Sequence, residues 1–468
     1  MYRTQVLNKA FLFSTALLVL TACGGGSGSD GGNSAAGGGG VTQVSGQLDG
    51  AFGNGTGVVL SSGGSNPTIS DNLLVFADGT LGQVSSPTLN GVNYLQTMHY
   101  NIDGSNGSSL GSLGSKACVT FISGTSACVF GPSLVQADGK IVQTFERQST
   151  SSIYTTVLVR FNKDGSFDNS FGSGGISEYS TAQASNAPVR LLQQADGKLL
   201  VLTKLITDPG ATGSNPKAYP VVMRYNADGT LDGTFNSTGV VKLGGQFSSN
   251  KDWIPYAMDI DLKNGQIYVA GERYNSSYNN EAFVIRLNLN GSVDGNYGLS
   301  GSATAMFRVY DQIDIAVEPA TSELFLVGRD SSTQYVYMTK LLSSGAPDQN
   351  FGFSGEIQVP VNISGEVYSF QRMHMGSDGM LYVLGATAGT SSQTNRVVMV
   401  RIATNGGFDT SFDNSTFSGL FATDIGVYPD LFMSDFRFMQ DGRIVMGGAW
   451  MSVGYSSTSY YTALMVIR

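Results

Sequence analysis

The chain has 468 residues, with 26 Lys and Arg against 35 Asp and Glu, and a formal net charge of −9 at pH 7. This acidic balance excludes nucleic acid and anionic lipid as binding partners, because both require a basic surface. Only 13% of the residues are charged, whereas Gly, Ser, Thr, Val and aromatic residues are abundant. Such a composition favours an all-β fold.

Residues 1–22 have the pattern of a signal peptide. Arg3 and Lys9 precede an apolar run from Ala10 to Leu20, which is too short to span a bilayer as a helix. The run leads into Leu20-Thr-Ala-Cys23-Gly24, which resembles the bacterial lipobox. This resemblance implies cleavage before Cys23 and a covalent lipid on that residue, and the sequence indicates no other cofactor.

Residues 23–44 form the expected tether. From Gly24 to Gly40 nearly every residue is Gly, Ser, Asn or Ala, and such a coil spans roughly 20–25 Å. A Gly after the Cys resembles the lipoproteins sent to the outer membrane, so we expect an outer-membrane lipoprotein, with the periplasmic and surface-exposed orientations both open. Loss of Arg3 and Lys9 leaves 24 basic against 35 acidic residues, a net charge of −11.

Residues 45–468 are predicted to form one repeat domain. A basic residue is followed by Gly after five positions, by Asp after eight and by an aromatic residue after eleven, and this unit recurs about every sixty residues. The basic and acidic positions of the complete copies are Arg160 and Asp168, Arg224 and Asp232, Arg286 and Asp294, Lys340 and Asp348, and Arg401 and Asp409.

Two half-copies stand at opposite ends of this domain. Asp49 and Phe52 lack their basic residue, whereas Arg468 lacks its second half. Complementary halves predict a closed ring in which Arg468 pairs with Asp49, and in which Gly57 to Leu60 form the fourth strand beside Tyr461 to Arg468. A second marker, Asp-Gly or Asn-Gly between apolar runs, indicates strand-to-strand turns. Seven places for each marker predict a seven-bladed β-propeller of four-stranded blades.

The repeat resembles the delta-60 repeat family of bacterial surface and exported proteins, whose units read roughly Asp-Gly-Lys-Ile and then Arg-x-Asn-x-Asp-Gly-x-Leu-Asp-x-x-Phe-Gly. The resemblance covers Gly46 to Arg468 and implies a β-propeller, but it brings no activity or catalytic residues. The first full repeat has His99 and Gly107 at the basic and acidic positions. Because base and acid are lost together there, we expect each Arg and Asp to pair within a turn; the alternative is a ring of Asp cation sites.

The sequence places its candidate binding residues on one rim. The tight turns all lie on one edge of the ring, which we call the turn rim. The longer connections between second and third strands lie on the opposite edge, the loop rim, and insertions gathered on one face mark a binding face. The candidate binding residues are Tyr154, Tyr219, Tyr274, Tyr278, Tyr335, Arg396, Trp450, Tyr455 and Tyr460. Their mixture with Ser and Asn suits a protein or glycan ligand.

Few residues suggest catalysis. His374 stands in an apolar run without a metal-ligand spacing, and Asp259 and Asp261, like Asp311 and Asp314, give a weak calcium hypothesis. Cys118 and Cys128 flank a predicted hairpin, and in an exported protein a disulfide between them is expected.

The leading hypothesis is a monomeric, lipid-anchored binding propeller with a role in adhesion or at the envelope, and without catalytic residues. The alternatives are a polysaccharide-acting enzyme with its site at the central channel and an envelope-assembly scaffold.

Overall fold

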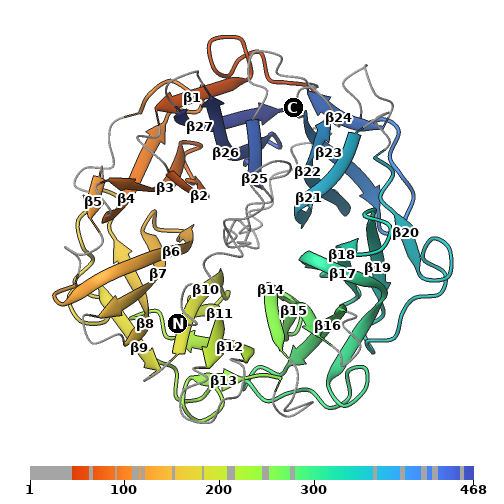
Figure 1. Cartoon of the computed structure of the whole chain (residues 1–468), viewed down its shortest axis with the longest axis horizontal. Coiled ribbons are helices and arrows are strands. Elements are labelled where there is room, and N and C mark those ends of the chain that lie inside the picture. Colours follow the sequence, from red (N-terminus) through yellow and green to blue (C-terminus); the bar gives the residue numbers. More distant parts are fainter. Residues whose placement is uncertain are drawn as a thin grey trace, which may run out of the picture.

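The chain forms a ring of antiparallel β-sheets around a central axis, as the computed structural model shows (Figure 1). The structure describes residues 45–62, 67–89, 92–107, 115–117, 122–149, 153–181, 184–207, 217–244, 252–274, 280–361, 366–389, 396–412, 419–423, 431–453 and 458–468. Within these ranges every regular element is a strand. The expected all-β propeller of four-stranded antiparallel blades is therefore confirmed.

The strands follow one another around the ring in chain order. Their bounds are β1 (Val58–Ser62), β2 (Pro67–Val75), β3 (Leu81–Leu89), β4 (Val92–Tyr100), β5 (Ser115–Ala117), β6 (Thr125–Val135), β7 (Ile141–Ser149), β8 (Tyr154–Phe161), β9 (Ile176–Thr181), β10 (Ala184–Gln193), β11 (Leu199–Thr207), β12 (Ala218–Tyr225), β13 (Val240–Lys242), β14 (Trp253–Ile260), β15 (Ile267–Tyr274), β16 (Asn280–Leu287), β17 (Ser302–Val317), β18 (Leu324–Asp330), β19 (Val336–Leu341), β20 (Glu356–Gln358), β21 (Glu366–Met375), β22 (Met380–Gly389), β23 (Arg396–Ala403), β24 (Leu420–Thr423), β25 (Leu431–Phe438), β26 (Ile444–Val453) and β27 (Thr458–Ile467).

Five sheets contain four strands each, and one sheet contains seven. The four-stranded sheets are β2 to β5, β6 to β9, β10 to β13, β21 to β24, and a sheet that joins β25, β26 and β27 to β1. The seven-stranded sheet runs from β14 to β20. Its long strand β17 changes partner part-way, because Arg308 is the last residue paired with β16 and Val309 is the first paired with β18.

The ring is closed by strands from opposite ends of the chain. β1 pairs antiparallel with β27, so that Val58 lies opposite Met465 and Ser62 opposite Tyr461. Gln47 and Arg468 also exchange backbone hydrogen bonds of 3.2 and 2.9 Å. The predicted closure of the last blade by an N-terminal strand is confirmed, and Figure 1 shows the C-terminus beside this sheet.

Each sheet packs between two neighbours, which explains the apolar runs in its middle strands. In one core cluster, Leu200 and Val222 of the β10 to β13 sheet lie against Trp253, Val269 and Phe283 of the next sheet. These five side chains are fully buried. A strand buried on both faces needs apolar residues at successive positions rather than an alternating pattern.

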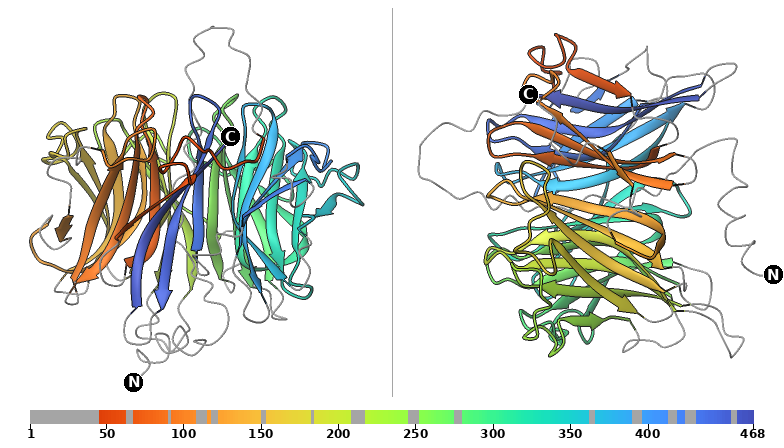
Figure 2. Two further views of the ribbon diagram at one scale, coloured as in Figure 1. Left: turned by 90° about the horizontal axis from the view of Figure 1, so that it is seen from above. Right: turned by 90° about the vertical axis from the view of Figure 1, so that its left-hand side faces the viewer.

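The two rims of the ring differ in their connections, and the edge-on views separate them (Figure 2). On the turn rim, glycines hold the left-handed backbone that a tight turn requires, with φ of 83° at Gly197 and 85° at Gly229. The connections between second and third strands lie on the loop rim. Among them, the segment between β18 and β19 is described over its whole length.

Candidate functional site

The recurring basic, acidic and aromatic residues form one contact unit on the turn rim. Arg160 Nε donates to Asp168 Oδ2 over 2.7 Å, and its guanidinium lies 4.5 Å from the ring centroid of Phe171. Arg160 Nη1 also donates to the carbonyl of Ala227, which belongs to the corresponding turn of the next sheet, over 2.6 Å. Each of the other copies forms the same ion pair, with distances of 2.8 Å for Arg224 and Asp232, 2.9 Å for Arg286 and Asp294, 3.7 Å for Lys340 and Asp348, and 2.7 Å for Arg401 and Asp409.

The carboxylate oxygens of these units accept hydrogen bonds from groups of the same turn. Asp168 Oδ1 accepts from the backbone N–H and the hydroxyl of Ser170, at 3.1 and 2.6 Å, while Oδ2 accepts from Arg160. Burial disfavours its charged form, but Ser170 and Arg160 hold the pKa of Asp168 well below its usual range. Both oxygens are therefore used within the turn, which favours a scaffold role over a ring of cation sites.

The closing turn differs from the expected pairing. Asp49 Oδ2 accepts from Arg443 Nη1 over 2.8 Å, so that Arg443 takes the place predicted for Arg468. The backbone gives the reason, because the N–H of Asp49 donates to the carbonyl of Val466 just as that of Asp168 donates to Arg160. Val466 thus occupies the basic position of this repeat, and Arg468 lies two residues beyond it.

The predicted loop-rim residues are spread over several sheets. Tyr335 exposes 54% of its surface, whereas Tyr219 is buried beneath the Lys242 ammonium, 4.1 Å from its ring centroid. Tyr154 and Arg396 are half-buried at the starts of β8 and β23. Tyr274 ends β15, and Trp450 and Tyr460 lie on the paired strands β26 and β27. Tyr278 and Tyr455 lie outside the described residues.

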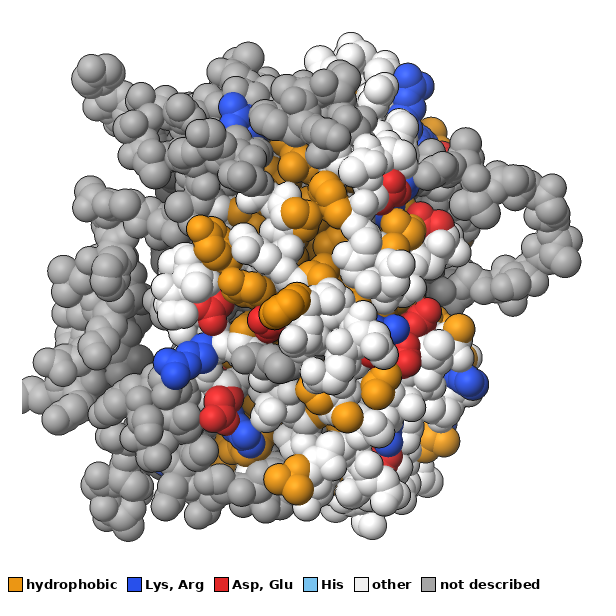
Figure 3. All heavy atoms as spheres, turned by 90° about the vertical axis from the view of Figure 1, so that its right-hand side faces the viewer, with side chains coloured by type: hydrophobic (Ala, Val, Ile, Leu, Met, Phe, Trp, Pro, Cys, Tyr) orange, Lys and Arg blue, Asp and Glu red, His pale blue; other side chains and the backbone are white. Residues whose placement is uncertain are grey.

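A pocket of about 280 Å³ opens in the seven-stranded sheet, where β17 changes partner. Its walls are Phe307 and Arg308 of β17, Asp330 at the end of β18, Ser332 and Thr333 of the connection that follows, Tyr337 of β19 and Glu356 of β20. These strands lie on the right-hand side of Figure 1, and Figure 3 views that side, where hydrophobic, acidic and basic side chains lie close together. The pocket therefore combines aromatic and acidic groups beside the loop rim.

The two carboxylates of this pocket have different surroundings. Asp330 Oδ1 accepts from the hydroxyls of Ser332 and Thr333, at 2.6 and 3.0 Å, and from their backbone N–H groups. Burial opposes ionisation, yet these bonds hold the pKa of Asp330 below its ordinary value. In contrast, burial and the nearby charge of Asp330 raise the pKa of Glu356. Its Oε2 is buried without a hydrogen-bond partner in the described part of the chain.

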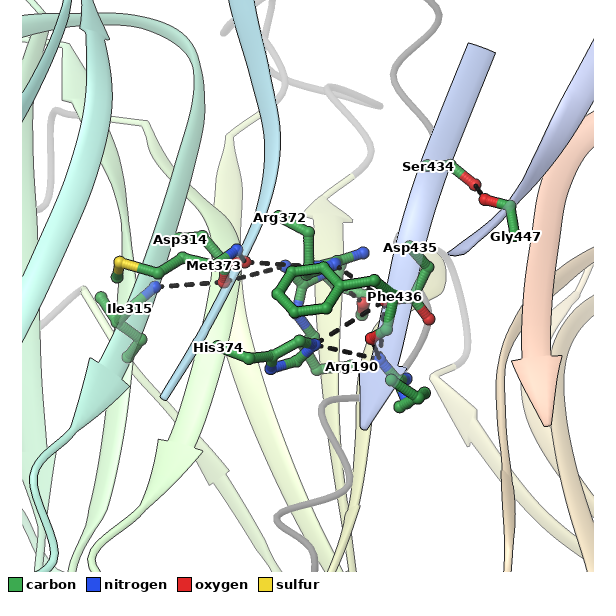
Figure 4. A network of polar contacts seen from close by, with 12 residues as sticks. Arg190, Asp314, Ile315, Arg372, Met373, His374, Ser434, Asp435, Phe436 and Gly447 are labelled. Carbon is green, nitrogen blue, oxygen red and sulfur yellow. Dashed lines mark hydrogen bonds and ion pairs between the residues drawn. The ribbon is translucent and has the colours of Figure 1, made fainter. Parts of the chain in front are cut away.

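A second polar site lies at the centre of the ring, where charged side chains from four inner strands meet (Figure 4). Arg190 of β10 donates to Asp314 of β17 over 3.3 Å, and Arg372 of β21 lies 3.6 Å from the other oxygen of Asp314. Arg372 also lies 3.4 Å from Asp435 of β25, which accepts from Arg437 over 2.6 Å. This chain of ion pairs links four sheets across the centre of the ring.

Burial shapes the electrostatics of this central network. Arg190 and Arg372 are 4% and 3% exposed. Burial, reinforced by the neighbouring charge of Arg372, lowers the pKa of Arg190 to about 10. Burial also lowers the pKa of His374, whose Nε2 lies 3.0 Å from Arg437 Nη1 and whose ring packs edge-on against Phe436. His374 is therefore a neutral, packed residue at neutral pH.

One of the candidate calcium ligands, Asp314, belongs to this network, whereas Asp259 and Asp261 accept from backbone groups. Both oxygens of Asp259 accept backbone N–H bonds of 2.8 Å, from Ile260 and Val317, and burial raises its pKa to about 7. Asp261 Oδ1 accepts from the backbone of Lys263. Within the described ranges, no three His, Cys, Asp or Glu side chains gather as metal ligands would. The occupied oxygens of Asp259 also argue against its use as a catalytic base.

The described residues include only one of the three cysteines that form the predicted anchor and disulfide. Cys23 and Cys118 lie outside them, whereas Cys128 is buried in the core beside Phe130 and Phe145. The disulfide and the lipid therefore stay predictions. In the described part of the chain no helix is long and apolar enough to cross a membrane.

Sequence reasoning missed both the pocket and most of the central network. Arg190, Arg372 and Asp435 each stand six residues before the Asp of an Asp-Gly turn, inside an otherwise apolar strand. A charge at that repeated position is a signal that could have been found. No comparable signal marks Phe307, Tyr337 and Glu356, because they meet only where β17 changes partner.

Comparison with known families agrees with this ring. Residues 136–171, 210–235, 262–296 and 376–412 match a family described as a domain of unknown function (DUF5122) beta-propeller. These four segments of the chain are thus similar to the DUF5122 β-propeller domain. Three of the matched segments begin near an Asp-Gly or Asn-Gly turn, and all four end at or next to the aromatic residue of the repeat unit. A search of curated proteins gave no match to this chain.

Solved structures similar to this chain belong to different kinds of protein. A protein of unknown function from Dyadobacter fermentans is 11% identical, with 88% of this chain and 100% of that chain covered and a TM-score of 0.42. Polysaccharide lyase Uly1 is 10% identical, with 86% and 90% covered and a TM-score of 0.41. Drosophila Semaphorin 2a is 9% identical, with 88% and 75% covered and a TM-score of 0.43. Similarity at this level carries no information on function.

Proposed function

We propose that this chain is an exported lipoprotein, anchored through a lipid on Cys23, whose propeller binds a protein or glycan through the loop rim. The pocket at Phe307, Tyr337 and Glu356 is the observation that carries this proposal. It combines aromatic rings with a buried carboxylate oxygen that has no partner among the described residues, a combination typical of ligand sites. On the turn rim, in contrast, Arg160 and Asp168 are occupied by each other and by neighbouring turns.

The seven-stranded sheet supports a ring of seven blades. Because β17 pairs through Ser302 to Arg308 with β16 and through Val309 to Val317 with β18, it serves as the outer strand of one blade and the inner strand of the next. Counted in this way, the sheet supplies two four-stranded blades beside the five others. Seven blades then agree with the seven repeats of the sequence.

The seam of the ring supports an orientation at the membrane. Ser45, the first described residue, donates through its hydroxyl to the carbonyl of Arg468, and Asp49 closes a turn on the turn rim. The tether that precedes Ser45 would leave the body there. In the proposed orientation the turn rim faces the outer membrane, and the loop rim faces the space where a partner is met.

Shortened loops test the binding face. Two-residue turns in place of Tyr274 to Asn280 and of Ser452 to Tyr460 should abolish retention of the native partner from an envelope extract, without a change in melting temperature. Replacement of the turn-rim residue Lys163 by Ala provides a control that should retain the partner. If the loop variants fold and still retain it, the loop rim is not the binding face.

The anchor has its own test. Cys23→Ser should move the protein from the detergent phase to the aqueous phase on phase separation and should end incorporation of labelled fatty acid. Cys128→Ser in the same assay serves as a control for loss of a different cysteine and should leave both readouts unchanged. Detergent partitioning that survives Cys23→Ser would contradict the anchor.

A further inference from the structure

The wall of the pocket is built by two aromatic rings that the backbone brings together. Phe307 and Tyr337 stack with ring centroids 6.0 Å apart and an angle of 29° between planes. Gly328 makes this arrangement possible, because a Cβ there would lie 2.7 Å from the Phe307 ring. Paired rings offer an apolar surface of the kind that packs against the C–H groups of a sugar ring.

The polar side of the pocket needs a hydrogen-bond donor. Glu356 Oε2 is buried without a partner among the described residues, and an unsatisfied buried acceptor is costly. The hydroxyls of Ser332 and Thr333 already donate to Asp330. Their oxygens can therefore only accept from a ligand, and that of Thr333 already accepts from the backbone N–H of Tyr335 over 3.3 Å. A ligand with several hydroxyl groups can meet both requirements at once.

The charge and the volume of the pocket further restrict the class of ligand. Among the described residues that line the pocket, two carboxylates, Asp330 and Glu356, stand against one cation, Arg308. Arg308 is exposed and contacts Asp330 through its backbone N–H. A ligand carboxylate would meet like charges, which disfavours uronic and sialic acids. The volume of about 280 Å³ lies just below the usual range of ligand pockets, about 300–1,000 Å³. It fits one sugar ring.

From this geometry we infer that the pocket at Phe307, Tyr337 and Glu356 is a subsite for a single pyranose ring of an uncharged or amino-substituted glycan. The rings pack against the C–H face of the sugar, and Glu356 accepts from a hydroxyl or amino group. Acidic sugars are rejected by Asp330 and Glu356. The inference rests on the proposed function of the loop rim and gives that rim its ligand class.

A glycan array probed with the full chain at pH 7 tests the inference. Neutral hexose oligomers, glucosamine oligomers and uronic acid oligomers serve as probes. We expect retention of at least one neutral or amino oligomer, with the uronic acid oligomers at least about tenfold weaker. Glu356→Gln keeps the shape of the side chain but removes its charge, and it should weaken binding about tenfold and reduce discrimination against the acidic oligomers. Tyr337→Ala should weaken binding without this change in discrimination.

A matched control is available on another sheet. Glu178 of β9 pairs with Arg147 over 2.6 Å and is not in the pocket, so Glu178→Gln should leave affinity unchanged. Failure to retain any neutral or amino oligomer, or equal retention of acidic ones, would overturn the subsite. Retention that survives Glu356→Gln and Tyr337→Ala but is lost with the Ser452 to Tyr460 loop would also overturn it, while the loop rim would stand. Loop variants that keep every partner would instead overturn the proposed function itself.

Discussion

Arg443 and Asp49 form an ion pair of 2.8 Å across the seam of the ring, between residues 394 positions apart in the chain. Arg443 also pairs with Asp441 in its own turn, over 2.8 Å. The first turn of the described chain is thus attached to the last complete hairpin by side chains as well as by the β1–β27 ladder. This lock replaces the pairing with Arg468 that the repeat spacing predicts.

Removal of the closing strand should destabilise the whole ring. Deletion of Ser45 to Ser61 removes β1 and Asp49, exposes the edge of β27, and should lower the melting temperature by roughly 10 °C or more. Arg443→Met removes the ion pair alone and should cost about 2 kcal/mol, because Asp49 is left buried without its cation. Differential scanning calorimetry measures both effects. Deletion of the tether from Gly24 to Gly40 is the control. An equal fall in melting temperature in that variant would contradict the role of the seam in stabilising the ring.

The repeat unit on the turn rim should be a larger source of stability than an exposed ion pair. Arg160→Met leaves Asp168 buried, breaks the bond to Ala227 and removes the contact with Phe171, so we expect a loss of about 3 kcal/mol or more in urea denaturation. Arg160→Lys should recover only part of this loss, since an ammonium lacks the planar fork that donates to Asp168 and to the carbonyl of Ala227 at the same time. Lys163→Ala removes the exposed pair with Asp78, and it should be indistinguishable from wild type. Similar losses of unfolding free energy for Arg160→Met and Lys163→Ala would show that burial does not determine how much these ion pairs contribute to stability.

The repeats revealed the ring because one local unit recurs with fixed spacing. Arg160, Gly165, Asp168 and Phe171 lie within one turn, so their contacts are encoded by short distances in sequence. The pairing of Arg443 with Asp49 could not be predicted in this way, because it depends on how Val466 and Asp49 align across the seam. The pocket at Glu356 depends on the change of partner along β17, a tertiary event without a local pattern.

Gly229 links two turns of neighbouring repeats and should not tolerate a side chain. Its φ is 85°, and a Cβ would lie 2.9 Å from the ring of Phe171 and from the backbone nitrogen of Gly172. Gly229→Ala should therefore cost about 2–4 kcal/mol, from the left-handed backbone and the clash together. Gly233→Ala is a matched control, because a Cβ there would have no neighbour within 4 Å. A loss for Gly229→Ala no larger than that for Gly233→Ala would contradict this packing.

Asp259 should make stability fall as the pH rises. Burial raises its pKa from 3.8 to about 7 in the folded protein, so between these values the folded state binds a proton that the unfolded state has lost. The unfolding free energy therefore decreases through this window, by at most about 4 kcal/mol, and is constant above it. Asp259→Asn removes this titration. The unfolding free energy of the variant, measured by urea denaturation, should therefore increase relative to that of wild type as the pH is raised from 5 to 8.

Asp232→Asn is the control for this pH dependence. Burial opposes its ionisation, but Thr234 and Arg224 lower the pKa of Asp232 below its ordinary value of 3.8. Its contribution to stability is present above that value and is lost only as the pH falls through the folded pKa. The difference between wild type and Asp232→Asn should thus be constant from pH 5 to 8. A difference between wild type and Asp259→Asn that is equally constant would contradict a raised pKa of Asp259 that lies within this range.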